Sequence, residues 1–555
     1  MKSLLTAALL LSTVALAQVP ATCDTQRPVD KYQHLRRLSL DLRGHVPSYE
    51  EYVALDSLPE VPASTVTQWV ASNDFRLVMR KYHEDLFWPN VSTVKLNNTN
   101  AQLAQRRINS VLEPAMSLVS AGRRARWRGV SDASTTHGLQ CGDFAATLLP
   151  GNDKRPDPAS LRITNTTTPA TKQEGWRLVH PYWEKDPTVM IQVCAYDAQE
   201  TEMSPMFPQY SCGDYRANND PACGCGKNLK FCFGPAAEVA DIIRADMREQ
   251  LGLLVDTVST GNKPYTDLVR TRTLQQSPAL DFWKKNLAQN MSLANVYSVP
   301  DETEPTIPDR DFTATTANTW RPVDRGSDMH AGALTSAAFL LRFQTNRARA
   351  NRYRIDFECE AFVPPSTIET AAAGCAESGT DLTGRCTCRY CHQTLEPLAA
   401  HWGQFTEAGT YLMAPPRFPL NSSTCIGSGS QYCGRFYVTN ATDVNPGRLL
   451  PYQYADASAP AGSPHKNIAT NIAAGPRALV DADLSGTAND AGKFAKCTAK
   501  RAFEYLMKRE MHTQTPLTDE VALQQQLAAD FKNNNYSLPK LFEAIVARPE
   551  YRSIR

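Results

Sequence analysis

The chain lacks a net charge of either sign. Its 555 residues include 58 lysines and arginines against 57 aspartates and glutamates, which leaves a formal charge of +1. No long-range electric field is therefore expected, so a nucleic-acid or anionic-membrane partner has no electrostatic support. Apolar residues make up 42% of the chain and charged residues 21%. This composition is ordinary for a globular protein and argues against wholesale disorder and against a polytopic membrane protein.

Beyond its first residues the chain also lacks long apolar runs. The run Leu4–Leu16 is short and ends in a small-x-small site that closes at Ala17. This pattern predicts a secretory signal over residues 1–17, cleaved after Ala17 and too short to span a bilayer comfortably. We therefore expect an exported protein, periplasmic or extracellular, whose mature chain has no stable membrane insertion.

The common short signatures of catalysis are missing as well. The sequence contains no Gly-x-Ser-x-Gly elbow, no Walker loop, no His-Glu-x-x-His and no dinucleotide glycine fingerprint. The sequence alone therefore assigns no catalytic residue.

Cysteine, in contrast, is plentiful, with 15 in the chain. Export would place these thiols in an oxidising compartment, where disulfides persist. Four cysteines among turn-forming residues between positions 212 and 232 predict two disulfides that pin a surface loop, and a zinc knot is the alternative. The four are Cys212, Cys223, Cys225 and Cys232. Further disulfide candidates are Cys359, Cys375, Cys425 and Cys433, whose connectivity cannot be deduced from sequence.

Apolar periodicity predicts a mainly α-helical protein. Helical spacing covers residues 31–88, 237–258, a short stretch from His330 to Phe343, and the last ninety residues. Ser48 and Glu51 form a capping-box pattern, and Val189–Ala195 is a possible short strand. Residues 299–326 and 414–465 are rich in proline and polar residues and predict a linker and a loop. The clearest helix carries an apolar stripe after Ser537, made of Leu538, Leu541, Phe542, Ile545 and Val546.

The strongest chemical signal is Cys388-Arg389-Tyr390-Cys391-His392. Two cysteines three positions apart face the same side of a helical turn, and each thiol can add to one haem vinyl group. His392 follows Cys388 by four residues, so its ring can reach the iron from that side, which is the pattern of covalent c-type haem attachment. Composition alone gives roughly 0.007 expected chance matches in this chain. The motif predicts one covalent haem c, bound by Cys388, Cys391 and His392.

Two other interpretations of the motif stay open. Cys386 offers a disulfide partner for Cys388 or Cys391, in which case His392 would be incidental. A zinc site made by Cys386 together with Cys388, Cys391 and His392 is the second.

The sixth iron ligand would decide the chemistry. Methionine raises the reduction potential and suits electron transfer, a second histidine lowers it, and an open position permits peroxide or oxygen chemistry. Met413 lies 21 residues after His392, and His330 precedes a predicted helix that could fold back, so both are candidate distal ligands. His401 lies nine residues after His392, where it would struggle to reach the opposite face of the haem.

Several blocks of the chain resemble exported planctomycete-type cytochrome c proteins. The opening RRLSLDLRGHVPSYEE and the KPYTDL segment resemble their DUF1549-type domain, and CRYCHQTLEPLAAHWGQFTEAG resembles their haem motif. Residues before the motif resemble DUF1588/DUF1592-type proteins, and the C-terminal part resembles the DUF1585/DUF1553-type helical domain. The blocks are residues 36–51, 262–269, 330–335, 346–354, 388–409 and 489–552.

The chain departs from the family pattern beside the haem motif. Glu396 stands where the family has aspartate, Ala399 replaces a glycine, and His401 occupies an apolar or small position, which leaves a ligand role for His401 open. The resemblance implies an exported protein with one covalent haem, and it supplies no substrate.

These observations combine into one expected organisation. We expect helical domains, a disulfide-stapled irregular or short-strand region, and a small c-type cytochrome-like helical domain. The expected segments are a signal at 1–17, a DUF1549-like helical part at 24–88, a mixed region at 89–298, a linker at 299–326, a haem-binding domain with loops at 327–465 and a helical domain at 466–555.

The favoured function is single-electron transfer by a mono-haem cytochrome with an unidentified redox partner protein. The alternatives are a haem peroxidase or oxygenase with an open sixth position, and a non-haem extracellular binding protein held by disulfides.

Overall fold

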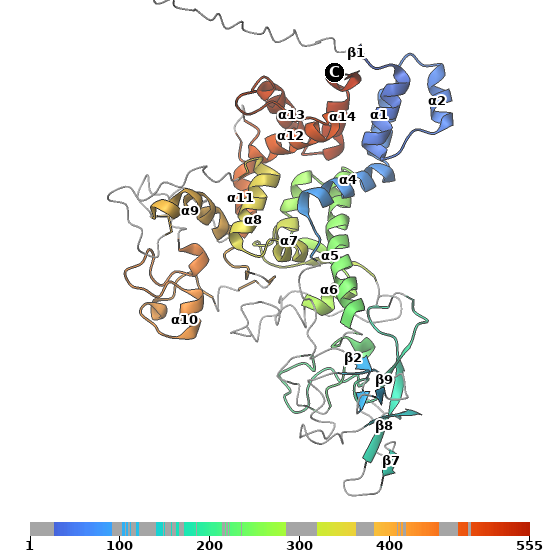
Figure 1. The fold of residues 1–555 in the computed structure, drawn as a ribbon, viewed down its shortest axis with the longest axis vertical. Coiled ribbons are helices and arrows are strands. Elements are labelled where there is room, and N and C mark those ends of the chain that lie inside the picture. Colours follow the sequence, from blue (N-terminus) through green and yellow to red (C-terminus); the bar gives the residue numbers. More distant parts are fainter. Residues whose placement is uncertain are drawn as a thin grey trace, which may run out of the picture.

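The computed structural model describes residues 27–91, 236–284, 319–361, most of 382–453, 475–554 except 487–489, and shorter pieces between 103 and 234. The described part of the chain is mainly helical, with 52% helix and 9% strand, as the sequence predicts. Most helices form one body, α9 and α10 lie on one side of it, and strands β2, β7, β8 and β9 lie at its far end (Figure 1). The predicted signal at residues 1–17 lies outside the described residues.

The N-terminal helices form where the sequence predicts them. Asp30 caps the first helix by accepting hydrogen bonds from two backbone amides, and Gly44 ends it in a left-handed conformation. The predicted capping box is present, since Ser48 Oγ accepts from the Glu51 amide and Glu51 Oε2 accepts from the Ser48 amide. The four helices are α1 (Lys31–Arg43), α2 (Tyr49–Asp56), α3 (Ala63–Val70) and α4 (Asn73–Phe87).

The C-terminal part is helical, as predicted. The apolar stripe of the last helix is buried along its whole length. Ser537 occupies the N-cap position of that helix, although its side chain makes no capping hydrogen bond. The helices are α11 (Gly475–Leu484), α12 (Lys493–Met507), α13 (Val521–Asn533) and α14 (Leu538–Val546), followed by the 3-10 turn η14 (Pro549–Arg552).

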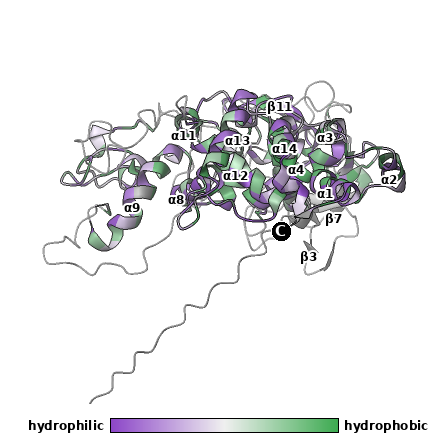
Figure 2. Ribbon diagram, turned by 90° about the horizontal axis from the view of Figure 1, so that it is seen from above, coloured by the Kyte–Doolittle hydropathy of each residue, from purple (hydrophilic) through white to green (hydrophobic). Residues whose placement is uncertain are grey.

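One hydrophobic core joins the two ends of the chain. It holds buried residues from Leu35 to Tyr551 and includes helix α5 (Ala236–Ser259), which confirms the helix predicted there. Strand β1 (Arg27–Pro28) pairs with β12 (Ser553–Ile554), so the two ends also share hydrogen bonds. The helical segments that look separate in sequence therefore pack as one unit. In Figure 2 the helices of this unit carry both hydrophobic and hydrophilic residues, as expected for elements with one buried face.

A mixed sheet forms the opposite end of the molecule. Its strand order is β2-β5-β9-β8-β6, with β7 paired to β8. Strand β9 falls inside the predicted strand, and the two predicted disulfides, Cys212–Cys223 and Cys225–Cys232, lie beside the sheet. The strands are β2 (Leu103–Gln105), β5 (Leu118–Ser120), β6 (Gln140–Ala145), β7 (Arg162–Asn165), β8 (Thr171–Val179) and β9 (Ile191–Cys194), with the separate pair β3 (Arg107–Ile108) and β4 (Val111–Leu112).

The segment from residue 319 to 361 differs in detail from its prediction. The end of the predicted linker is strand β11 (Arg321–Asp324), which pairs with β10 (Thr273–Gln276). The single helix expected from His330 is broken at Ser336, which has an extended backbone (ψ 154°) and whose Oγ caps the following helix by accepting from the Phe339 amide. Its parts are η8 (Gly332–Thr335) and α7 (Ala337–Arg342). They are followed by α8 (Asn346–Tyr353) and the π-helical turn η9 (Arg354–Glu358). Helix α6 (Pro278–Phe282) precedes β11 in the chain.

The described part of the predicted loop 414–465 is mostly turns, as expected, with short helices that the composition does not reveal. These are η11 (Ser423–Cys425), α10 (Gln431–Phe436) and η12 (Leu450–Tyr452). Cys425 and Cys433, two of the disulfide candidates, pair with each other. Cys359 pairs with Cys497, which was not among the candidates. Cys375 lies outside the described residues.

The disulfides agree with an oxidising location outside the cytoplasm. Among the described residues, no helix is both long and apolar enough to cross a bilayer.

Candidate haem-attachment site

The Cys-x-x-Cys-His motif lies at the start of helix α9 (Cys386–Ala399). Pro397 is inside the last turns of this helix. Residues spaced by four and three positions share one helix face, so Cys388, His392, Glu396 and Ala399 lie along the same side of α9. This face therefore carries one motif thiol and the motif imidazole.

The two motif cysteines differ from the other described cysteines. Ten cysteines are disulfide-bonded, Cys386 among them, whereas Cys388 and Cys391 are free thiols at partly exposed positions. Cys386 is therefore not the disulfide partner of either motif cysteine. It also has no thiolate to give to zinc, and no group of three or more metal-binding side chains is found within the described part of the chain. The arrangement leaves both thiols available for thioether formation.

His392 is held by a carboxylate on its own helix. Its Nδ1 lies 2.5 Å from Glu396 Oε1, and the imidazole is 23% exposed while Glu396 is buried. The same oxygen accepts a hydrogen bond from Arg347 Nε of α8 at 2.6 Å. A neutral ring that donates from Nδ1 has its lone pair on Nε2, the atom that binds a metal. His392 Nε2 has no hydrogen bond to any residue in the described part of the chain.

A cavity of about 490 Å³ opens beside this face of α9. Glu396 and Ala399 line it from the helix, and Met413 lines it from the segment that follows. Met413 is buried, and its backbone amide donates to the Gln404 carbonyl at 2.7 Å. This hydrogen bond holds Met413 near the end of α9. The volume lies within the range of ordinary cofactor pockets. The remaining walls come from α8, α10, η12, Leu382 and residues 405–407, so the motif cysteines and His392 lie beside the cavity and do not line it.

His330, the second candidate distal ligand, lies behind the wall of this cavity. Its ring packs edge-on against Phe405 with centroids 5.7 Å apart, and Phe405 itself lines the cavity. His330 is buried, and its Nδ1 has no hydrogen-bond partner among the described residues. Burial lowers the pKa of His330 well below the usual range of a histidine, and Arg325 adds to this effect. The structure thus brings Met413, and not His330, to the cavity surface.

His401 points away from the motif. Its Nδ1 lies 3.1 Å from the Gly475 carbonyl at the start of α11, and burial lowers its pKa to about 4. The neighbouring Trp402 is buried and donates from Nε1 to the Leu334 carbonyl. Both side chains belong to the helical core in this structure, and neither lines the cavity.

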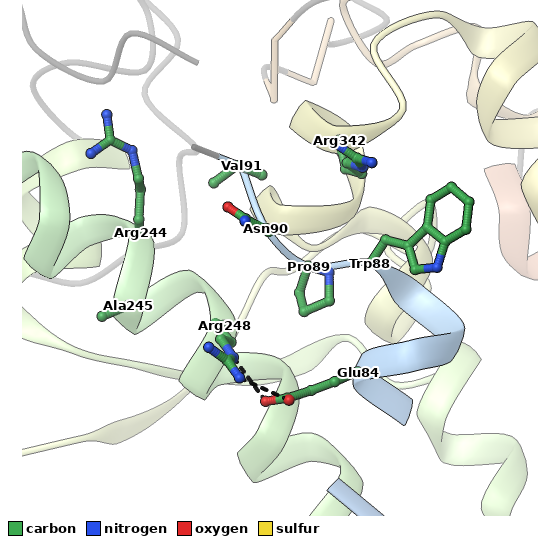
Figure 3. A pocket seen from close by; sticks show the side chains of 9 residues that line it. All are labelled: Glu84, Trp88, Pro89, Asn90, Val91, Arg244, Ala245, Arg248 and Arg342. Atoms are coloured by element: carbon green, nitrogen blue, oxygen red, sulfur yellow. Dashed lines mark hydrogen bonds and ion pairs between the residues drawn. The ribbon is translucent and has the colours of Figure 1, made fainter. Parts of the chain in front are cut away.

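A second cavity, of about 550 Å³, lies between the end of α4 and helix α5 (Figure 3). Arg248 and Glu84 point toward each other there and form two hydrogen bonds of 2.8 Å. Arg244 is paired with Asp241. Because these two arginines have carboxylate partners and no residue of α9 lines the space, this cavity gives no support for a catalytic or haem site.

The sequence predicts a role for the motif residues and for Met413, but it gives no indication of Arg347. Glu396 was visible as a departure from the family pattern, and its spacing of four from His392 could have indicated a contact. The approach of Arg347 depends on how α8 packs on α9, which no local pattern reveals.

Comparison with known proteins gives no match: no family model, no curated protein and no solved structure is similar to this chain.

Proposed function

We propose that the protein is an exported mono-haem c-type cytochrome that carries single electrons to and from a partner protein. The observation that carries this proposal is the pair of free thiols, Cys388 and Cys391, in a chain that has ten disulfide-bonded cysteines among its described residues. A Cys-x-x-Cys pair left reduced next to a metal-binding histidine is the arrangement that covalent haem attachment needs. The resemblance of residues 388–409 to exported cytochrome c proteins supports the same assignment.

The three motif residues fit a covalently attached haem in number and type. Cys388 and Cys391 would hold the porphyrin through two thioethers, and His392 would bind the iron through Nε2. A bound haem c supplies a one-electron iron couple. Helix α9 fixes the two thiols and the imidazole on neighbouring positions, and the buried Glu396 holds the imidazole in one orientation.

Met413 is the proposed distal ligand. It lines the cavity beside α9 with a buried thioether side chain, whereas His330 is separated from that cavity by Phe405. Methionine ligation raises the reduction potential and closes the sixth position, which favours electron transfer over peroxide or oxygen chemistry. A haem peroxidase or oxygenase is the alternative, and it requires that Met413 leave the iron or not bind it.

The test is covalent haem in the purified protein after expression with a functional c-type maturation system. A haem-stained denaturing gel and intact mass should show one haem per chain. Cys388→Ala or Cys391→Ala should lose most of that haem and lower the yield, whereas His392→Ala should keep some attached haem with an altered spectrum. Cys212→Ser/Cys223→Ser, which removes a disulfide away from α9, should keep the haem.

A wild-type gel without haem, or a disulfide between Cys388 and Cys391 in the mass spectrum, would overturn the proposal and leave the disulfide-stabilised binding protein. The distal ligand is tested separately. Met413→Ala should abolish the far-red band of oxidised Met-ligated haem and allow carbon monoxide to bind, whereas His330→Ala should keep the band. Carbon monoxide binding to the wild type would favour the haem enzyme.

A further inference from the structure

We propose that Glu396 controls the electron density at the haem iron through His392, and that Arg347 limits this effect. This inference rests on the proposed haem attachment. Glu396 acts here as a positioning residue, because it touches His392 and not the reacting iron.

Glu396 and His392 form a carboxylate–histidine pair of the kind that orients a metal-binding imidazole. Glu396 Oε1 lies 2.5 Å from His392 Nδ1, and Glu396 is itself only 7% exposed. A hydrogen bond to a charged group is stronger than a neutral one, and a protein interior screens it less than water does. A carboxylate in this position fixes the tautomer of the ring and makes its other nitrogen a more basic ligand.

A more basic imidazole stabilises ferric iron more than ferrous iron, since the higher charge gains more from a stronger donor. Glu396 therefore works against the effect of Met413, which favours the ferrous form. The chain would then carry two residues with opposite influences on the iron couple, Glu396 acting through His392 and Met413 acting as a ligand.

Arg347 shares the oxygen that His392 uses. Its Nε lies 2.6 Å from Glu396 Oε1, and its side chain is 43% exposed. The guanidinium draws negative charge away from the carboxylate, so it weakens the acceptor that faces His392. Because Arg347 lines the same cavity and is partly accessible, a partner protein that binds its guanidinium would strengthen the donor effect of Glu396.

The test is the reduction potential of haem-loaded variants. In Glu396→Gln the ratio of ferric to ferrous protein at a fixed potential should fall at least about tenfold, which is a rise of about 59 mV for one electron. Arg347→Gln should shift the potential in the opposite direction. The matched control is Glu407→Gln, since Glu407 lines the same cavity and accepts a hydrogen bond from the Asn346 amide without touching His392.

A second measurement separates contact through the ring from charge at a distance. The Nδ1 proton of His392 in the reduced protein should give a proton NMR signal that moves in Glu396→Gln and stays in Glu407→Gln. Equal potential shifts in the two glutamine variants, or an unmoved Nδ1 signal in Glu396→Gln, would overturn this inference. Absence of haem from the wild type would instead overturn the proposed function, so the two failures are distinguishable.

Discussion

His83 shows how a polar residue is accommodated inside the helical core. Its Nδ1 lies 2.7 Å from the Met79 carbonyl and its Nε2 lies 2.9 Å from Tyr265 Oη, so a neutral ring donates to one and accepts from the other. Burial lowers the pKa of His83 to about 4 from 6.5. The folded state therefore holds a neutral imidazole that the unfolded chain protonates readily. Such residues make the stability of the core depend on pH.

We predict that His83 contributes a loss of stability in mild acid. Because its folded pKa is depressed, its contribution is fully present above the unfolded value of 6.5 and is lost as the pH falls toward 4. Between pH 7 and pH 5 the loss should be about 2 kcal/mol. The measurement is the unfolding free energy of the wild type and of His83→Gln at both pH values.

Comparing the wild type with His83→Gln separates the effect of His83 from that of groups whose contribution to stability falls as the pH rises. Asp356 has a pKa raised to about 7 by burial, so its contribution is lost as the pH rises, and it is present in both proteins. A free-energy difference between wild type and variant that does not change from pH 7 to pH 5 would contradict the prediction.

At the scale of elements, helices with one continuous apolar stripe were predictable and sites made from distant segments were not. The stripe of α14 could be identified from five residues, and all of them are buried. The predicted helix after His330 was wrong in its continuity, because Ser336 leaves the helical conformation and caps the separate helix α7.

The candidate site was likewise predictable from sequence only in part. The motif on α9 could be found because its two cysteines and its histidine lie within five consecutive residues. The cavity depends on α8, α9, α10 and η12 together, and its walls include residues from 346 to 453. Nothing in the local sequence of Met413 shows that it lines this space. Its candidacy as a ligand came from its residue type and its position 21 residues after His392.

We predict that truncating the central aromatic side chain of α14 lowers the unfolding free energy substantially. Phe542 is fully buried and packs edge-on against Phe75 of α4, with ring centroids 5.3 Å apart, and it also faces Tyr505 of α12. Phe542→Ala should lower the unfolding free energy by about 3–5 kcal/mol, through lost burial and the cavity left behind. Denaturant unfolding followed by circular dichroism measures this change.

Lys540→Ala on the same helix is the control, because this side chain is half exposed and its ion pair with Glu543 joins neighbouring turns. Its effect should stay below about 1 kcal/mol. Similar losses in the two variants would show that α14 does not hold α4 and α12 together through Phe542.

At the scale of the whole molecule, contacts far apart in sequence close the chain on itself. Strands β1 and β12 pair at the two ends, and Tyr551 Oη donates to Asp41 at 2.8 Å. The Cys359–Cys497 disulfide adds a covalent link between η9 and α12, across a sequence separation of 138 residues. That closed loop contains α9, Met413 and most residues that line the cavity, so the candidate motif lies on a segment tied to the helical core at both ends.

The length of this loop leads to a prediction about the whole fold. A cross-link stabilises mainly by restricting the unfolded chain, and the entropy it removes grows with the logarithm of the loop length. Cys359→Ser/Cys497→Ser should therefore cost about 5 kcal/mol in the chain-entropy estimate, and Cys425→Ser/Cys433→Ser, with a separation of only 8 residues, about 2.5 kcal/mol. Chemical denaturation of the two variants and the wild type measures both costs.

The first variant should also unfold in a transition that includes α12, because Cys497 is buried in that helix. If the short loop proves to matter as much as the long one, native-state packing rather than chain entropy sets the value of these links, and the segment that carries α9 is held to the core by its side-chain contacts instead.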